Sequence, residues 1–196
     1  AKLGDYEGVR HAAALDVTLI DHRPDLILPG LIDTHIHFPQ MQVIGSHGTQ
    51  LLDWLNKYTF VEEQKFASDE HCARIASLFV DELIRCGTTT AVAYCTVHKA
   101  SAEAYFTEAA RRNMCLIGGK VMMDRNAPEK LRDTPQSSYD DTKALISKWH
   151  GKGRALYAIS PRFGITSSEA QLELTQALAN EHPECFVQTH LSENDH

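Results

Sequence analysis

"GLIDTHIHF", residues 30–38, is the stretch of this sequence that most directly indicates its fold. Two histidines, His35 and His37, follow an apolar run, LILPGLID at 26–33, which predicts a buried β-strand. Side chains at positions i and i+2 of a strand point to the same face, so we expect both imidazoles at its carboxyl end. Such a pair is typical of a metal site, although two hydrogen-bonded structural histidines would give the same short pattern.

The rest of the chain alternates between predicted helices and strands. Further strands are predicted at 88–95, 114–124, 155–163 and 185–193, and the helices between them at 68–87, 101–113, 137–153 and 166–182. Five strands alternating with helices indicate parallel βαβ units. Polar residues follow several of these strands, which favours a (β/α)₈ barrel, and no GxGxxG motif supports a dinucleotide-binding sheet. A long connection after the first strand holds a short apolar helix candidate at 51–60.

Composition excludes several classes of protein. The 196 residues are 43% hydrophobic and 23% charged, as expected for a globular domain. The net charge of −7, without a basic run, argues against nucleic acid and anionic membranes as partners. No apolar run reaches the roughly 20 residues of a membrane span, and the first residues lack the apolar core of a signal peptide. Five scattered cysteines without a CxxC pair complete the prediction of a cytoplasmic protein.

Several segments carry a resemblance to a known family. PGLIDTHIHFPQ resembles the first-strand signature of the amidohydrolase superfamily, whose metal lies at the mouth of a TIM barrel. QLLDWLNKYTF, GTTTAVAYCTVH, GKVMMDRNAP, SPRF and THLSEN occur in the order and spacing of the guanine deaminases. The resemblance implies an α/β fold comprising the first five strands of a (β/α)₈ TIM barrel over residues 26–196. It also implies that residues 1–25, with a strand at 14–21, belong to a small β-sandwich.

The same resemblance assigns roles to individual residues. The metal ligands fall on His35, His37 and His190, and the proton-transferring glutamate on Glu193. The substrate contacts fall on Gln40, Arg162 and Phe163. One zinc per active site is implied, because the bridging lysine of two-metal relatives is missing from AISPRF, and iron or manganese would also suit imidazole ligands. The activity implied is hydrolytic deamination of guanine to xanthine and ammonia, by a homodimer.

The residue types suit these roles, and each also has a structural interpretation. In VQTHLSE, strand alternation places His190 with Gln188 and Ser192 on one face. Arg162 has only donors and suits a purine carbonyl, Phe163 could stack on a base, and Gln40 offers both a donor and an acceptor. A carboxylate at Glu193 could move protons. A surface salt bridge for Arg162 and a solvated loop carboxylate for Glu193 are the structural alternatives.

Other functions and roles stay open at this point. The same chemistry could act on another aminopurine, a pterin or a triazine, or the chain could be a non-catalytic fragment, since a histidine and an aspartate ligand of later strands are absent. Asp124 and Asn126 could border the pocket or cap a helix. The remaining histidines have no partner at ligand spacing and are predicted to be ordinary polar residues: His47, His71, His98, His150 and His182.

Overall fold

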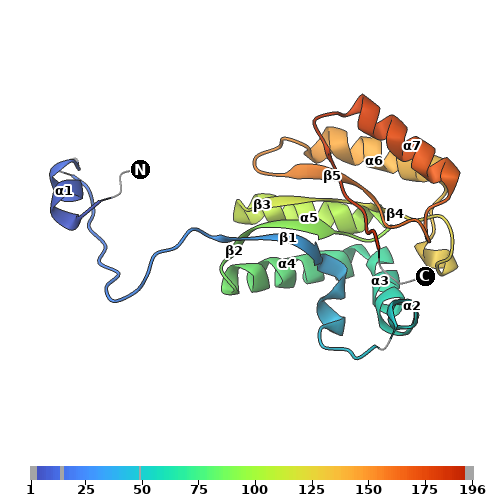
Figure 1. The fold of residues 1–196 in the computed structure, drawn as a ribbon, viewed down its shortest axis with the longest axis horizontal. Helices are drawn as coiled ribbons and strands as arrows, with labels where there is room; N and C mark the ends of the chain where they lie inside the picture. Colours follow the sequence, from blue (N-terminus) through green and yellow to red (C-terminus); the bar gives the residue numbers. More distant parts are fainter. Residues whose placement is uncertain (1–3, 14–15, 49, 193–196) are drawn as a thin grey trace.

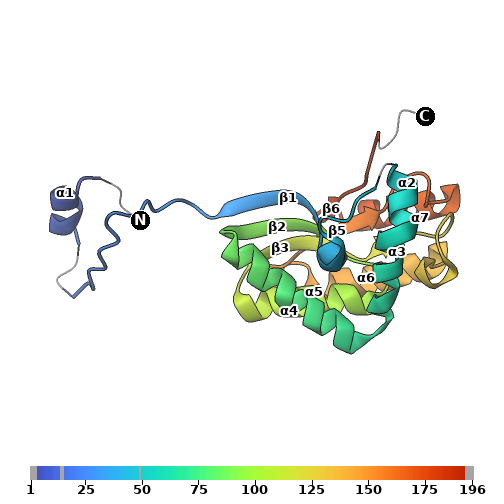
Figure 2. The same ribbon diagram turned by 90° about the horizontal axis from the view of Figure 1, so that it is seen from below.

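The computed structural model describes residues 4–13, 16–48 and 50–192. Six parallel strands form one sheet in the order β1-β2-β3-β5-β4, with β6 also paired to β5. Helices lie along one face of this sheet (Figures 1 and 2). The strands are β1 (Leu31–His37), β2 (Thr88–Tyr94), β3 (Cys115–Gly119), β4 (Val121–Met122), β5 (Leu156–Pro161) and β6 (Phe186–Val187).

Each of the five predicted strand regions contains strand structure, and three of the regions differ from the prediction in extent. The region 114–124 is split into β3 and β4 because the backbone N–H of Lys120 donates to the Tyr157 hydroxyl, 3.1 Å away, instead of to a neighbouring strand. Within 185–192, the described part of the last region, only β6 is a strand, and beyond it His190 forms an isolated parallel bridge with Phe163. All strands therefore direct their carboxyl ends to the same side.

The first strand differs more strongly from the prediction. The strand begins at Leu31, not at residue 26, and it occupies one edge of the sheet beside β2. Its first two apolar side chains are exposed, Leu31 at 59% and Ile32 at 67%, whereas Ile36 is partly buried against the main core. The prediction of a buried strand at 26–33 is therefore wrong for the described structure, because no described segment covers the apolar side chains of this stretch.

The predicted helices are confirmed. α4 begins after a Ser68 cap, whose hydroxyl accepts from the His71 N–H, and is followed by Gly87, whose φ of +77° is readily adopted by glycine. Ser168 caps α7 in the same way by accepting from the Gln171 N–H. The four main helices are α4 (Asp69–Arg85), α5 (Lys99–Arg112), α6 (Pro135–Trp149) and α7 (Glu169–Glu181).

The main core lies between these helices and the sheet. Phe79, Tyr105, Phe106 and Leu116 are all at most 1% exposed and belong to one cluster. Close approach of the strands depends on Gly119, where an added Cβ would collide with the carbonyl oxygen of residue 158 on β5. A second, smaller cluster lies at the carboxyl ends of the strands: Leu55, Phe60, Tyr94, Val97, Val121, Met123, Leu131 and Phe163.

The connection between β1 and α4 runs over the carboxyl ends of the strands (Figure 2). The predicted helix at 51–60 is present but longer, since helical turns continue from Leu51 to Ala67 and include a π-helical turn. In order, this connection contains η1 (Phe38–Val43), α2 (Leu51–Trp54), η2 (Leu55–Thr59), α3 (Phe60–Glu63) and η3 (Gln64–Ala67). A further short 3₁₀ turn, η4 (Glu129–Leu131), follows β4.

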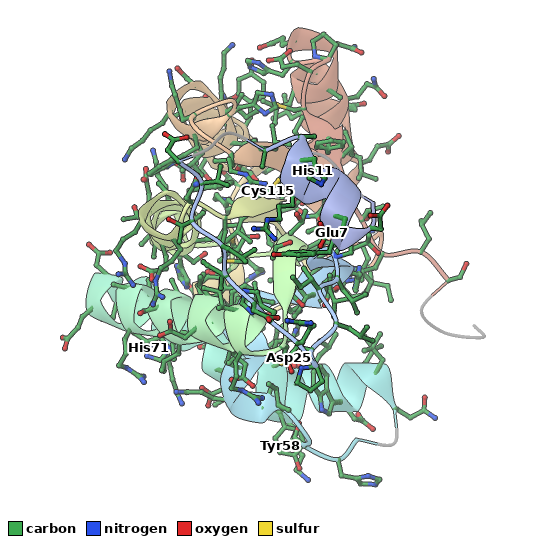
Figure 3. All side chains as sticks on the ribbon, turned by 90° about the vertical axis from the view of Figure 1, so that its left-hand side faces the viewer. Glu7, His11, Asp25, Tyr58, His71 and Cys115 are labelled. Carbon is green, nitrogen blue, oxygen red and sulfur yellow. The ribbon has the colours of Figure 1, made fainter. Side chains whose placement is uncertain are left out.

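Residues 4–13 and 16–30 extend away from the sheet (Figure 1). They form a short helix, α1 (Tyr6–His11), with no buried side chain, and Glu7 and His11 project from it (Figure 3). The predicted strand at 14–21 is wrong for its described part, because residues 16–21 are exposed and pair with no strand of the described chain. Membership of residues 1–25 in a β-sandwich stays a prediction. Within the described ranges, no helix combines the length and apolar character needed to cross a bilayer.

Candidate metal centre and active site

Three histidines from two distant parts of the chain meet at the mouth of the sheet. His35 and His37 come from the end of β1, and His190 follows β6. One nitrogen from each ring lies within 4.8 Å of the others. The Nε2 atoms of His37 and His190 are 3.1 Å apart. The structure thus brings together the three residues that the sequence predicts as ligands.

Neighbouring groups fix the orientation of the imidazoles. The Nδ1 atom of His190 lies 2.7 Å from the backbone carbonyl oxygen of Arg162, which can only accept, so Nδ1 carries the proton and Nε2 is the unprotonated nitrogen. Tyr94, at the end of β2, stacks on both His37 and His190, with ring centroids 4.8 and 4.4 Å away. A hydrogen bond at one nitrogen that directs the other is the usual arrangement around a metal-binding histidine.

The electrostatics also favour neutral imidazole at His37. Burial, the Arg162 guanidinium and the other two histidines together hold the pKa of His37 well below its usual value. A neutral ring keeps a lone pair for a metal near neutral pH, whereas a protonated ring has none.

These residues fit a bound divalent cation. Two nitrogens on one tetrahedral zinc, each at about 2.0–2.1 Å, are separated by about 3.3–3.4 Å. The observed 3.1 Å between the Nε2 atoms of His37 and His190 is close to that spacing. A direct hydrogen bond between the rings is the other interpretation of this distance, and it would require His37 to donate from Nε2, because His190 carries its proton on Nδ1.

A pocket of about 150 Å³ opens beside the three histidines. The predicted substrate-binding residues Gln40, Arg162 and Phe163 all line it. Its remaining wall is supplied by Leu51, Trp54 and Leu55. The pocket therefore combines a metal-ligand set with one cation, one amide and an apolar wall, as small-molecule sites commonly do.

Arg162 is held from behind by an acidic side chain. Its Nη1 donates to Oε2 of Glu63 over 2.7 Å, and the guanidinium carbon lies 5.4 Å from the centre of the Phe60 ring. Arg162 is only 2% exposed and Glu63 is fully buried. The interpretation of Arg162 as a surface salt bridge is therefore wrong.

The other candidate residues have structural roles or lie outside the described chain. Asp124 accepts from the backbone N–H and the hydroxyl of Ser168, and the Asn126 amide donates to the carbonyl oxygen of residue 165. Both side chains thus fasten the loop before α7, and neither lines the pocket. Glu193 lies outside the described residues. The five remaining predicted histidines join no metal-ligand cluster in the described part of the chain.

Sequence reasoning missed four contributors to this site. Trp54 lines the pocket and donates from Nε1 to the Ser46 hydroxyl over 2.9 Å. Tyr94 packs under the imidazoles, and Gln188 donates to Oγ of Ser160 and to the carbonyl oxygen of residue 93 beneath them. Glu63 holds Arg162. The length of the connection at 38–67 is the signal that indicated a functional segment without identifying which side chains it contributes.

Comparisons with known proteins agree with this geometry. Residues 26–196 match the amidohydrolase family. Guanine deaminase of Escherichia coli (strain K12) is 48% identical over 191 residues, which are 97% of this chain and 44% of that protein. The solved structure of the E. coli enzyme covers 98% of this chain and 44% of its own, at a TM-score of 0.95 and 47% identity.

A second relative carries a ligand. The crystal structure of guanine deaminase from C. acetobutylicum with bound guanine in the active site is 32% identical at a TM-score of 0.85, and covers 92% of this chain and 43% of its own. This chain therefore spans less than half the length of these relatives. Its sheet corresponds to an amino-terminal part of their TIM barrel. With most of its length matched from residue 26 onward, and a three-histidine cluster at the mouth of a parallel sheet, the chain belongs to the amidohydrolase family.

Proposed function

We propose that this chain supplies metal ligands and substrate contacts for the hydrolytic deamination of guanine to xanthine and ammonia. One observation carries the proposal. The three-histidine cluster and a buried arginine border the same small pocket. Several guanine deaminases resemble the chain, and the structure of one of them has guanine bound in its active site. The activity would belong to the longer protein that contains these residues.

The ligands proposed for the metal are His35, His37 and His190. Zinc is the proposed ion, one per site, and iron or manganese would suit the same nitrogen ligands. When bound, such an ion makes a water molecule acidic enough to deliver hydroxide near neutral pH. The carbonyl of Arg162 supports the site by holding the proton of His190 on Nδ1.

The pocket residues would hold the base. Arg162 donates to the ring carbonyl of guanine, Gln40 pairs with the adjoining amide-like edge, and Phe163 packs on the ring. Leu51, Trp54 and Leu55 exclude water from the remaining side. These contacts would place the amine-bearing carbon of guanine beside the histidine cluster.

Glu193 is the proposed proton carrier. In the reaction a carbon–oxygen bond forms at the amine-bearing carbon, the carbon–nitrogen bond breaks, and the nitrogen leaves as ammonia. The Glu193 carboxylate takes a proton from the attacking water and delivers it to the departing nitrogen. This role rests on the resemblance of THLSEN to the guanine deaminase motif.

Two other functions are weighed against this one. A pterin, a triazine or another aminopurine would use the same metal chemistry, and adenine differs because it presents an amine where guanine presents a carbonyl. Arg162 has no acceptor for that amine, which favours guanine. A non-catalytic binding fragment is disfavoured by the three converging imidazoles and by the lowered pKa of His37, because both features suit metal binding.

The test combines metal analysis with an ammonia-release assay. The full-length protein that contains this chain is purified, its bound metals are quantified, and guanine and adenine are compared side by side. We expect about one metal per site and ammonia release from guanine only. Release of ammonia from adenine at a similar rate, or from neither base by the metal-loaded protein, would overturn the proposal.

Two broader properties belong to the same proposal. The enzyme would act as a homodimer in the cytoplasm, on a small-molecule substrate and with neither nucleic acid nor membrane as a partner. The acidic net charge and the five cysteines, all unpaired among the described residues, support this environment. Sedimentation analysis of the full-length protein would test the dimer.

A further inference from the structure

Glu63 is a buried acid that the proposed mechanism does not use. Glu63 is the last residue of α3, in the long connection after β1. It pairs with Arg162, which directly follows the carboxyl end of β5. The two residues are 99 positions apart in the sequence, yet Glu63 is 0% and Arg162 is 2% exposed. Glu63 is not part of the pocket wall, whereas Arg162 is. The carboxylate therefore stands behind the arginine.

This ion pair is poorly suited to stabilise the fold. Oε2 of Glu63 accepts from Arg162, but the other oxygen, Oε1, is buried without a hydrogen-bond partner among the described residues. Removing two charges from water is costly, and the attraction between them compensates only when the remaining lone pairs and protons are also satisfied. A half-satisfied buried carboxylate is a reason to look for a role outside stability.

The contacts of Arg162 indicate what that role is. A guanidinium is planar and rigid, so one hydrogen bond at Nη1 together with a ring below it constrains the direction of every other N–H. Glu63 supplies the hydrogen bond and Phe60 supplies the ring. Within the described residues, the Arg162 side chain makes no other hydrogen bond, so its remaining donors are available on the pocket side.

We propose that Glu63 is the positioning residue that orients Arg162 toward the ring carbonyl of the substrate. This inference rests on the proposed function. Glu63 thereby selects purine bases that carry a carbonyl beside the amine, without touching them. A rigidly held donor discriminates better than a mobile one, because it cannot rearrange to suit a base that lacks the acceptor.

The experiment compares two substrates in matched variants of the full-length protein. Glu63→Gln removes the charge but keeps the size of the side chain. Its kcat/KM for guanine should fall by about 10-fold or more, mainly through KM, because the orienting hydrogen bond loses its charge. Its kcat/KM for 2-aminopurine, which lacks the carbonyl, should stay within about threefold, because Arg162 has no acceptor to address.

The neighbouring acid provides a matched control. Glu62 lies on the same helix but pairs with Lys65. Glu62→Gln should therefore leave the ratio of kcat/KM for guanine to kcat/KM for 2-aminopurine unchanged. A second variant, Glu63→Asp, keeps the negative charge and withdraws it by one methylene. It should also lower the efficiency on guanine selectively, since misplacing a binding group by about 1 Å is enough to reduce turnover. Glu63→Asp decides the question if Glu63→Gln does not fold.

The outcomes separate this inference from the proposed function. A wild-type protein that releases no ammonia from guanine rejects the function itself. An active wild type whose Glu63 variants lose both substrates by the same factor, or lose neither, rejects only the positioning role. Metal content is measured in every variant, because a guanine-selective loss at normal metal occupancy is the result that a merely structural role would not give.

Discussion

Two buried ion pairs lie at the carboxyl ends of the strands, and they differ in how completely their polar atoms are satisfied. Lys120 pairs with Asp133 and also donates to the Val121 carbonyl oxygen and the Ser138 hydroxyl. Asp133 in turn accepts from a backbone N–H and from the Gln171 amide. Among the described residues, the pair of Arg162 and Glu63 has a single hydrogen bond and one carboxylate oxygen, Oε1, without a partner.

The difference separates a pair enclosed by the protein from the pair for which we propose a function. Lys120 is 1% exposed and lies outside the pocket, so its donors serve only the protein. Arg162 is just as buried but borders the pocket, so its donors are available to a ligand. Low exposure alone therefore does not distinguish the two ion pairs, whereas the number of hydrogen bonds that their polar atoms make does.

The largest expected effect tests the functional pair. Arg162→Met should lower kcat/KM for guanine by about 10⁴-fold, because a base carbonyl would then face no donor in a closed pocket. The efficiency on 2-aminopurine should fall much less, and the metal should stay bound, because His190 uses the backbone of Arg162 and not its side chain. The measurement is steady-state kinetics on both substrates with metal analysis. Equal losses on both substrates would make Arg162 a structural residue.

The next effect tests the structural pair. Lys120→Met leaves Asp133 buried without its cation, which should cost about 3–5 kcal/mol of unfolding free energy. Urea-induced unfolding measures this loss. Lys65→Met, which removes an exposed partner of Glu62, is the control and should cost about 0–1 kcal/mol. If Lys120→Met instead changes the ratio of kcat/KM for guanine to kcat/KM for 2-aminopurine without loss of stability, the assignment of a purely structural role to Lys120 is contradicted.

A carboxylate outside both pairs separates chemistry from recognition. Glu193→Gln should keep metal and guanine binding but lower kcat by at least about 10²-fold, the usual scale for a positioned acid–base group. Single-turnover kinetics measure the chemical step, and a separate measurement of guanine affinity measures binding. Turnover within a few-fold of the wild type would remove Glu193 from the mechanism.

The smallest effect concerns the loop that follows Arg162 and Phe163. Ser168→Ala removes the cap of α7 and a hydroxyl bonded to Asp124, and should cost about 1 kcal/mol of stability. Thermal unfolding measures the loss, and both substrates should retain their efficiencies. If guanine turnover falls by more than the loss of stability can explain, Asp124 and Ser168 also shape the pocket.

Local patterns in the sequence predicted most of the main elements and two of the three clustered histidines. The alternation of strands and helices placed β2, β5 and the four main helices within a few residues of their observed bounds. The spacing of His35 and His37 depends only on strand geometry, and the resemblance added His190. Parallel strands then bring these residues to one edge, as expected.

What the sequence did not predict depends on contacts between distant segments. Glu63 meets Arg162 across 99 residues, and no local pattern marks one glutamate of the pair at 62–63 as the buried one. The strand expected at 14–21 and the burial expected at 26–33 both require neighbouring strands, which the described residues do not provide there. Propensity identifies a candidate strand, but pairing and packing decide whether it forms and is buried.

Arg162 contributes to the site through two chemically independent parts. Its carbonyl oxygen, which every amino acid possesses, orients His190, and its guanidinium faces the pocket. A mutation at this position changes the second part without altering the first. Under the proposed function, single substitutions at position 162 would change substrate preference while the histidine cluster keeps its geometry. A barrel in which the backbone and the side chain of one residue serve separate purposes can acquire new substrate specificities by few mutations.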